Sequence, residues 1–482
     1  MARRKLPTFE RLQRGERLNR KERREVQQRL NLDDPGLDMI HRDAAGIDVG
    51  NESHFVSVPP DRDPHPIREF GSWTAALEAM ARWLKDCGIR TVVMQSTGVY
   101  WIALHDVLQR QGLEVKLVDA RGTKNVPGRK SDVQECQWLR KLHTYGLLRP
   151  CFLPPPEIHA VRTLWRLHIQ HVRDAGRCIQ QMQKALIQMN VQLHNVLSDI
   201  SGVSGQAIIR ALLKGERNAR VLAKLRDRRC EASEEEIMQS LQGNWKEDVL
   251  FELQQAVDAY DFYQRQMKQC DQQLRRYMSA LPTHVPVPAP APSLPSAKEG
   301  KQGRTRKSRR QGNQPAFDLA AELERILGVN PITIDGIDVL TIQTVLAEVG
   351  PDLSAWKTER HWTSWLNLAP KRDVSGGRVV RHVRQHYTNR AGNAFRMAAQ
   401  SLVRSQSYLG ARYRYLRAKL GGLKAVKAMA RYLACLYYRL LTQGQIWVDR
   451  GTEEFNRRSQ QRELAALQRK ARKHGLQLVP AA

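Results

Sequence analysis

Three acidic residues have the types and the spacing of a binding site for a hard metal ion. Asp48 lies in the hydrophobic run GIDVG, where a buried carboxylate is costly unless it is paired or binds a cation. Asp132 and Glu135 lie three positions apart in GRKSDVQECQW, at the expected start of a helix, so both side chains project from one helical face, about 5–6 Å apart at Cβ. Carboxylate oxygens in such a set can hold Mg²⁺ against phosphate oxygens. These residues therefore indicate metal-dependent chemistry on a phosphate group.

Each of these acids, taken alone, also has a structural explanation. An aspartate at the end of a strand can cap a turn, and acids in the first turn of a helix are common because they offset the helix dipole. Ser131 could cap the same helix. Only the combination of a strand-borne acid with two acids on one helix face favours the metal site.

A serine beside two glycines is a second candidate for chemistry. The stretch KRDVSGGRVV is expected to be a basic loop that holds Ser375. Ser-Gly-Gly in a loop is usually a turn, because glycine adopts backbone angles that other residues avoid. A free serine hydroxyl is a poor nucleophile that needs a metal or a base and in-line phosphate geometry, and this loop contains no convincing base. These residues alone leave both interpretations open.

The composition indicates a polyanionic partner. The 482 residues include 78 Lys and Arg against 49 Asp and Glu, which gives a net charge of +29. The basic residues are spread over the N-terminus, a central run, the region 371–396 and the tail, which fits long tracks of phosphate contacts better than one local patch. We therefore expect a nucleic-acid partner, although a charge run is often only a solvated face.

Other features predict where the protein works. No apolar stretch approaches the roughly 18 residues that span a bilayer, and the N-terminus lacks the apolar core of a signal peptide. The seven cysteines are scattered, with no C-x-x-C pair to suggest a zinc site or a disulfide framework. We expect a cytoplasmic protein with no membrane partner.

Alternating strand-like and helix-like runs in residues 44–145 predict the elements that position the acids. Three strand-like runs, AAGIDVG, SHFVSVP and IREFGSW, come first, and helices then alternate with the strands TVVMQS and EVKLVDA. A last helix opens near Ser131. This order predicts a mixed α/β sheet that begins with a three-stranded meander and is covered by helices.

Two stretches downstream have the three-four spacing of apolar residues that is typical of a coiled coil. They cover about 175–196, which includes Ile179, Leu186 and Leu193, and about 253–281. The two helices could pair with each other or with a second protomer, and either stretch alone would also fit an ordinary helix of one bundle. The regularity of both favours oligomerisation.

Changes in composition and periodicity predict six segments along the chain. They are a basic N-terminal arm (1–43), a catalytic α/β domain (44–155), a coiled-coil helical region (156–281), a disordered linker rich in proline and basic residues (282–316), a C-terminal domain with the serine loop (317–447) and a basic C-terminal helix and tail (448–482).

Four stretches together resemble the DEDD-type transposases of bacterial insertion sequences. They are GIDVG, MQSTGVYW, GRKSDVQECQWL and LNLAPKRDVSGGR, in this order along the chain. The resemblance spans roughly residues 44–447. It implies a RuvC-like, RNase H-like N-terminal domain, a coiled-coil insertion and a mainly α-helical C-terminal transposase domain with a serine.

This resemblance implies roles for individual residues. The first acid of the family falls on Asp48 and the final acidic pair on Asp132 and Glu135, with Glu135 in place of the usual Asp. The second acid, commonly Glu, falls on Gln95, whose amide oxygen can ligate Mg²⁺ without adding a charge. The family's serine falls on Ser375, which implies a nucleophile on DNA phosphate. Mg²⁺, with Mn²⁺ as an alternative, is the implied cofactor.

Basic residues and glycines near the acids and the serine are expected to contact nucleic acid. Arginine can neutralise a phosphate, and paired glycines let the backbone approach it closely. The expected residues are Lys130, Arg372, Gly376, Gly377, Arg378, Arg381 and Arg390.

The resemblance implies an enzyme that cuts and rejoins donor and target DNA for insertion-sequence mobility. Several members of the family are directed by a structured noncoding RNA, and the serine domain of one protomer completes the acidic site of another. A guide RNA and a homo-oligomer, a dimer or tetramer held by the coiled coil, are therefore implied partners. Two alternatives stay open: a RuvC-like nuclease for branched DNA, which would not need Ser375, and a catalytically silent nucleic-acid-binding descendant, which Gln95 would favour.

Overall fold

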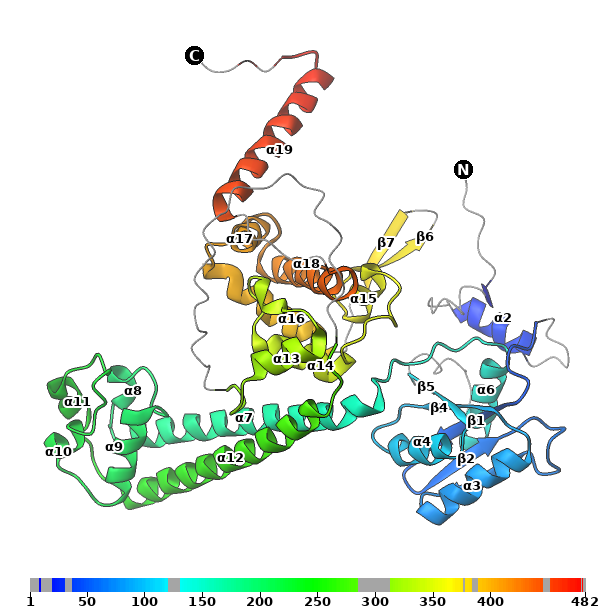
Figure 1. The fold of residues 1–482 in the computed structure, drawn as a ribbon, viewed down its shortest axis with the longest axis horizontal. Helices are drawn as coiled ribbons and strands as arrows, with labels where there is room; N and C mark the ends of the chain where they lie inside the picture. Colours follow the sequence, from blue (N-terminus) through cyan, green and yellow to red (C-terminus); the bar gives the residue numbers. More distant parts are fainter. Residues whose placement is uncertain are drawn as a thin grey trace. The chain divides into compact units, whose positions relative to one another are not determined.

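The structure is a computed structural model and divides into two compact units, Met1–Leu153 and Pro154–Ala482 (Figure 1). The residues that it describes are 8–9, 20–30, 37–119, 131–284, 313–375, 378–383, 389–444, 451–477 and 479.

Unit 1 is built on a five-stranded mixed sheet of order β3-β2-β1-β4-β5. Strands β1 to β3 are antiparallel neighbours, whereas β4 pairs in parallel with β1 and with β5. The strands are β1 (Ala44–Val49), β2 (Ser53–Ser57), β3 (Ile67–Gly71), β4 (Thr91–Gln95) and β5 (Glu114–Val118). The predicted meander followed by alternating helices and strands is confirmed.

Three helices cover this sheet: α3 (Thr74–Asp86), α4 (Trp101–Arg110) and α6 (Asp132–Thr144). The odd-numbered residues of β1, among them Ile47 and Val49, share one buried cluster with Met80 of α3 and Leu104 of α4. Because side chains alternate along a strand, the even-numbered residues of β1 face the other way, and α6 packs on that side.

The N-terminal segment contains a helix that packs on unit 1. Helix α2 (Arg20–Leu30) buries Val26 and Leu30 in a cluster with Leu142 and Leu147, which lie at and just beyond the end of α6. The predicted basic arm over residues 1–43 therefore contains a basic helix that packs on unit 1, which the prediction did not include. Two apolar residues four positions apart, within a run of charges, are enough to dock it.

Unit 2 begins with two long helices, α7 (Pro156–Gln188) and α12 (Glu247–Ser279), which pack against each other. They run antiparallel, since Lys184 lies 3.2 Å from Glu252 while His168 lies 2.9 Å from Asp271. Of the two pairings that the apolar spacing left open, the structure contains the one within the chain (Figure 1).

The first apolar run does not form one continuous helix. Helix α7 ends at Gln188, and Asn190 adopts a left-handed conformation with φ of 58°. Leu193 therefore lies in the separate short helix α8 (Leu193–Val196). Leu186 and Leu193 are both buried within the chain, so the prediction that they pair with a second protomer is wrong.

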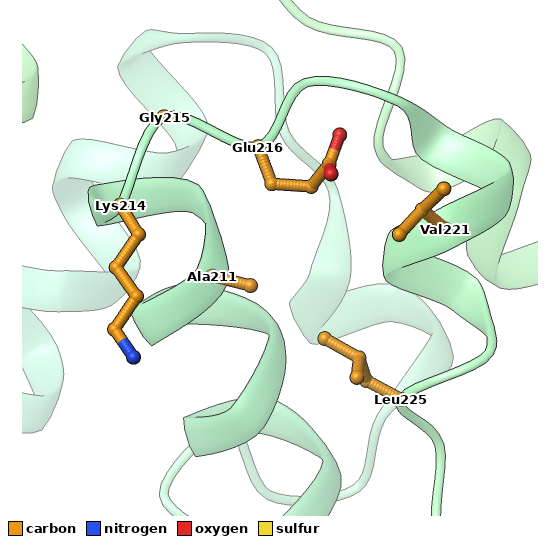
Figure 2. A pocket seen from close by; sticks show the side chains of 6 residues that line it. All are labelled: Ala211, Lys214, Gly215, Glu216, Val221 and Leu225. Atoms are coloured by element: carbon orange, nitrogen blue, oxygen red, sulfur yellow. The ribbon is translucent and has the colours of Figure 1, made fainter.

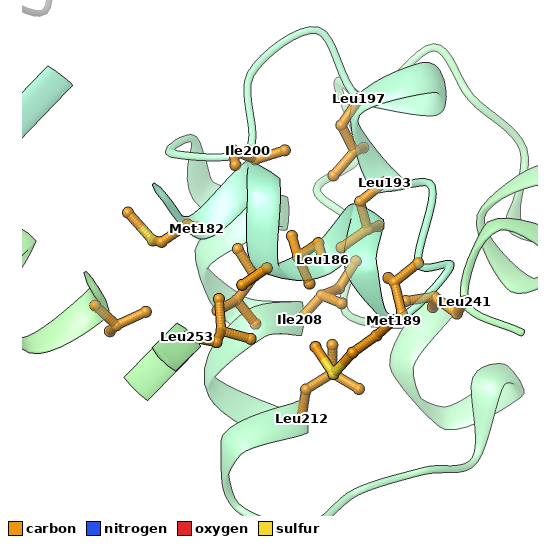
Figure 3. Close-up of a cluster of buried hydrophobic side chains, with 14 of the residues drawn as sticks. Met182, Leu186, Met189, Leu193, Leu197, Ile200, Ile208, Leu212, Leu241 and Leu253 are labelled. Atoms are coloured by element: carbon orange, nitrogen blue, oxygen red, sulfur yellow. The ribbon is translucent and has the colours of Figure 1, made fainter. Parts of the chain in front are cut away.

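Small helices close the end of this helical pair around a shared core. They are α8, α9 (Val203–Leu213), α10 (Ala219–Ala223) and α11 (Glu234–Ser240). Met182, Leu186, Ile208, Leu241 and Leu253 belong to one buried cluster, which Figure 3 shows. The residues of the apolar spacing are thus used to bury a core inside unit 2.

The rest of unit 2 is mainly helical, as predicted. Its elements are α13 (Leu319–Leu327), η1 (Pro331–Thr333), α14 (Val339–Val349), α15 (Glu359–Trp365), β6 (Lys371–Ser375), β7 (Arg378–Val383), α16 (Arg390–Ser401), η2 (Leu402–Arg404), α17 (Tyr408–Leu420), α18 (Gly422–Gln443) and α19 (Gly451–Lys473). Helix α19 confirms the predicted final basic helix. None of the described helices combines the length and the apolarity of a membrane span.

Polar contacts join the helical pair to this C-terminal part of unit 2. Trp165 of α7 donates to Thr344 of α14 (Nε1 to Oγ1, 3.1 Å). The backbone N–H of Ala316 donates to the buried Asp271 of α12 (2.8 Å). Most of the predicted linker, residues 285–312, lies outside the described residues.

Candidate functional site

Helix α6 lies in direct contact with strand β1. A Cβ built on Gly46 would lie 2.4 Å from the carbonyl oxygen of Cys136 and 2.4 Å from the backbone nitrogen of Arg140. Only glycine allows this approach without a shift of the helix. The position of the acids on α6 is therefore fixed against the centre of the sheet.

Asp48 and Gln95 belong to the sheet face that α6 covers. Gly46 is paired in register with Val93 of β4, and Val93 shares a buried cluster with Leu139 of α6. Asp48 and Gln95 each lie two residues further along their strands, and side chains two residues apart share a face. The two strands thus bring both predicted residues to one side of the sheet.

Gln95 and Glu135 are in direct contact. The Gln95 amide donates through Nε2 to Glu135 Oε1 at 2.6 Å, and Gln95 is buried. The structure therefore brings together two predicted site residues that lie 40 positions apart in the chain. The amide nitrogen, and not the amide oxygen, faces the carboxylate.

Ser131 caps the helix that contains the two final acids. Its side chain accepts a hydrogen bond from the backbone N–H of Gln134 (3.3 Å), so the predicted capping role falls to the serine. Asp132 and Glu135 lie in the first turn of α6, where the helix dipole favours acids. Asp132 is exposed and Glu135 is half-buried.

The charge of Asp48 acts on the residue next to Glu135. Burial first, and then the charge of Asp48, raise the pKa of the Cys136 thiol to about 12. This thiol stays protonated at neutral pH and is not a nucleophile. Asp48 and Gln95 directly follow Ile47 and Met94, which are paired in register on β1 and β4, so Asp48 lies next to Gln95 on the face that α6 covers.

Arg140 is a neighbour of the site that the sequence analysis missed. Its Nε donates to Ser57 Oγ at 3.2 Å, and burial lowers the pKa of its guanidinium. Asp132, Cys136 and Arg140 are spaced four residues apart, so they share one face of α6. This four-residue spacing in the sequence could have predicted the positive charge of Arg140 beside the acids.

The four predicted metal ligands offer hard oxygen atoms, but they do not surround one point as a complete coordination shell would. Asp48, Asp132, Glu135 and the amide oxygen of Gln95 are of the type that Mg²⁺ prefers. Among the described residues, however, no three His, Cys, Asp or Glu side chains gather closely enough to hold a metal ion. The exposed Asp132 is the acid whose position is least fixed by contacts.

Ser375 lies on a β-hairpin, not in the basic loop that the sequence suggested. Strands β6 and β7 pair antiparallel, with Ser375 opposite Arg378 at the end of the ladder. A two-residue glycine connection between strand-like runs is a hairpin signal, which explains the difference. The connecting residues Gly376 and Gly377, and likewise Lys130, lie outside the described residues.

An aromatic cluster packs together the two helices that flank this hairpin in the sequence. Trp362 of α15 is buried, packs edge-to-face on Phe395 of α16 and donates through Nε1 to the carbonyl of Ala434 in α18 (3.1 Å). Helix α15 precedes the hairpin and α16 follows it, so both ends of the hairpin join a packed core. Arg372 and Arg381 lie on the two strands, and Arg390 is the first residue of α16.

A separate pocket lies among the small helices of unit 2. It is lined by Ala211, Lys214, Gly215, Glu216, Val221 and Leu225 (Figure 2). None of these is a predicted site residue, and Lys214 and Glu216 bring opposite charges to it.

Two family models match the chain, and they fall on the two regions described above. A transposase model of the DEDD, IS110 type matches residues 45–191, and a model described as transposase IS116/IS110/IS902 family matches residues 317–414. The chain belongs to the IS110 family of transposases. The first match contains Asp48, Gln95, Asp132 and Glu135, and the second contains Ser375. No curated protein matches the sequence.

Membership in this family establishes the transposase in general terms as an enzyme that cuts and rejoins DNA. DEDD transposase domains generally use divalent metal ions. The sequence resemblance to insertion-sequence transposases is confirmed.

Proposed function

We propose that this transposase inserts mobile DNA through an acidic Mg²⁺ site in unit 1 and a serine nucleophile, Ser375, in unit 2. The observation that supports it most is the contact between Gln95 and Glu135 on the α6 face of the sheet, beside Asp48. It joins two of the predicted motifs, and the register of β1 and β4 brings Asp48 next to Gln95.

In this proposal Asp48, Asp132 and Glu135 hold the metal, with Gln95 as a neutral fourth ligand. The bound ion supplies electrostatic stabilisation of charge on the phosphate oxygens. Asp132 completes the set from the first turn of α6, where it is exposed. Gln95 orients the carboxylate of Glu135 through its amide N–H.

Ser375 attacks a DNA phosphate in the proposed second part of the reaction. Its Oγ forms a bond to phosphorus, the phosphorus–oxygen bond to one deoxyribose breaks, and a DNA hydroxyl later displaces the serine. Arg372, Arg378 and Arg381 offset the negative charge of that phosphate. The glycines 376 and 377 allow the strand to approach the hairpin closely.

We further propose that the transposase acts as an oligomer and with an element-encoded guide RNA. The net charge of +29 supports binding of both RNA and DNA. The oligomer would have to use surfaces other than Leu186 and Leu193, which are buried within the chain. Exposed apolar residues on the long helices, such as Phe251 and Phe262, are available.

A mixing experiment tests whether the two parts of the site come from different protomers. Asp48→Asn and Ser375→Ala are prepared separately and then combined with DNA and the copurifying RNA. Each is expected to be inactive alone, and mixed assemblies should regain part of the strand-transfer activity. A mixture that stays inactive, despite proven co-assembly, contradicts the shared site.

The same variants separate the alternative functions. A RuvC-like nuclease would lose branched-DNA cleavage in Asp48→Asn but keep it in Ser375→Ala. A silent descendant would show no metal-dependent strand transfer even as the unaltered protein with its RNA. Gln95 is the feature that favours this second alternative, because it removes one of four charges from the acidic set.

A further inference from the structure

Two arginines of α7 share one buried carboxylate in unit 2. Arg166 donates through Nε to Glu348 Oε1 (2.9 Å) and through Nη2 to Glu348 Oε2 (2.7 Å). Arg162 Nη2 lies 3.1 Å from Glu348 Oε2. Glu348 lies on α14, and its side chain is only 8% exposed. The bidentate geometry fixes the plane of the Arg166 guanidinium.

Two more arginines extend this group towards solvent. Arg162, Arg166 and Arg173 are four and seven residues apart on α7, so they lie in one stripe that spans about 40° of the helix. Burial and then the charge of Arg166 lower the pKa of Arg390, and the charge of Arg173 adds to this. Helix α14, which contains Glu348, packs against both α7 and α16, and Arg390 is the first residue of α16. We call Arg162, Arg166, Arg173 and Arg390 the arginine cluster.

The arginine cluster contains more positive charge than the protein neutralises. Among the described residues, Glu348 is the one acid at salt-bridge distance from any of these four arginines. Asp174, the acid next in sequence to Arg173, is instead hydrogen-bonded to Arg177 and Gln170. The Nε of Arg162 is buried and has no hydrogen-bond partner among the described residues. Guanidinium groups stay charged at neutral pH, so the excess persists.

Helix α16, which starts with Arg390, packs against the segment that leads into the serine hairpin. Arg390 opens α16, and the preceding Asn389 donates through Nδ2 to the carbonyl of Trp365 (3.1 Å). A Cβ built on Gly392 would lie 2.1 Å from the carbonyl oxygen of Leu366, so the start of α16 touches the end of α15. Strand β6 starts at Lys371, five residues after Leu366, which a chain can span in at most about 17 Å.

We propose that the arginine cluster binds a backbone phosphate of the DNA strand on which the serine hairpin acts. The excess of guanidinium groups matches the bidentate recognition of phosphate, and the exposed Arg173 and Arg390 can reach a strand in solvent. The positive end of the 12-residue helix α16 adds to the attraction. Glu348 keeps Arg162 and Arg166 in place beneath them (Figure 1 shows α7, α14 and α16).

The position of the arginine cluster near the serine hairpin favours DNA over RNA as its ligand. Leu366, which the start of α16 touches, lies nine residues before Ser375, a span of at most about 30 Å, which corresponds to about nine nucleotides at 3.4 Å each. A phosphate held there would fix the strand near Ser375. This assignment rests on the proposed function, since it takes DNA as the substrate of the serine hairpin.

Salt-dependent binding of the full chain tests the proposal. The variants are Arg390→Ala and Arg173→Ala, which leave the Glu348 contacts intact, and the matched control is Arg228→Ala. Arg228 is an exposed arginine of unit 2 in the segment between α10 and α11. The affinity for a short DNA duplex and for an RNA of the same sequence is measured by fluorescence anisotropy over a range of salt concentrations.

We expect each cluster variant to weaken DNA binding about 5- to 10-fold and to lower the slope of log K against log salt by about 1, because one phosphate contact is lost. The control should stay within about 2-fold of the unaltered protein. If the variants still bind and cut DNA and their slopes of log K against log salt are unchanged, the proposal that the arginine cluster binds DNA is overturned, but the proposed function is not. Weaker RNA binding with unchanged DNA binding would overturn the choice of DNA, and a chain that binds no DNA at any salt would overturn the proposed function as well.

Discussion

The acidic face of unit 1 and the arginine cluster of unit 2 are built in opposite ways. The acids lie at the ends of sheet strands and on a helix that a glycine locks against the sheet, so their backbone positions are fixed by the core. Of the arginines, which lie on the surfaces of helices, Arg162 and Arg166 are held by Glu348. Removing an acid should therefore change chemistry and leave binding, whereas removing an arginine should change binding in proportion to charge.

The largest expected effect is the loss of strand cleavage in Asp48→Asn. This change removes a carboxylate from the proposed metal site but keeps the shape of the side chain, so cleavage should fall by about 10³-fold or more. DNA binding should remain within about 2-fold, because one charge in +29 hardly alters the attraction to phosphate. Cleavage rates and anisotropy on the same DNA measure both effects. Cleavage at an unchanged rate would end the assignment of Asp48.

The second prediction concerns the glycine that seats α6. A methyl group in Gly46→Ala would meet the backbone of Cys136 and Arg140, which cannot rotate away, so α6 must move off the sheet. We expect unit 1 to lose about 3 kcal/mol of stability, the upper range for overpacking. Calorimetry of the full chain measures this loss. As a matched control, Gly112→Ala adds a methyl group with nothing within 4 Å and should cost less, through its left-handed φ alone.

A third prediction tests Gln95 as a ligand of the acidic site. In Gln95→Glu a carboxylate would replace the amide that now bonds Glu135 at 2.6 Å, so the two acids would repel each other without a cation. Unit 1 should melt at a lower temperature in EDTA, and added Mg²⁺ should restore more stability to the variant than to the unaltered protein, because it binds the ion several-fold more tightly. An equal response to Mg²⁺ in both proteins would place residue 95 outside the ligand set.

Much of unit 1 could be predicted because its signals are local. The alternation in AAGIDVG and SHFVSVP, and the order of strands and helices, led to the observed sheet and placed Asp48, Gln95 and α6 correctly along the chain. The contact between Gln95 and Glu135 could not be predicted, since it depends on how α6 crosses the sheet. The docking of α2 was also missed, because two apolar residues in a charged run give little periodic signal.

Unit 2 was predicted less completely, because more of its structure depends on contacts between residues far apart in the sequence. The apolar spacing identified both long helices, but it could not show that they bury their seams on each other or that Asn190 ends the first one. The arginine cluster joins residues of α7 and α16, and its Arg166 lies 182 positions from its partner Glu348 on α14. Only tertiary packing brings such residues together.

The smallest expected effect is a loss of stability in mild acid that originates in unit 1. His143 of α6 is buried, and its ring lies 2.9 Å from Thr91 Oγ1 and stacks on His41. Burial first, then the charges of His41 and Lys116, lower the pKa of His143 to about 3. Below its ordinary pKa of about 6.5 the unfolded chain binds a proton that the folded unit does not.

Stability therefore falls as the pH decreases from about 6.5 towards 3, and unit 1 should lose about 1 kcal/mol between pH 7 and 5.5. The arginine cluster keeps its charge over this range, so it adds nothing to the change. Calorimetry of the full chain at several pH values measures the shift, and His143→Gln, which cannot titrate, is the control. The pKa of His41, which stacks on His143, is also lowered by burial and by the charge of Lys116. The stability of the variant should therefore still depend slightly on pH through His41. If stability falls equally with decreasing pH in the unaltered protein and in His143→Gln, then either His143 is already protonated in the folded unit or another group causes the fall. Either result contradicts the prediction.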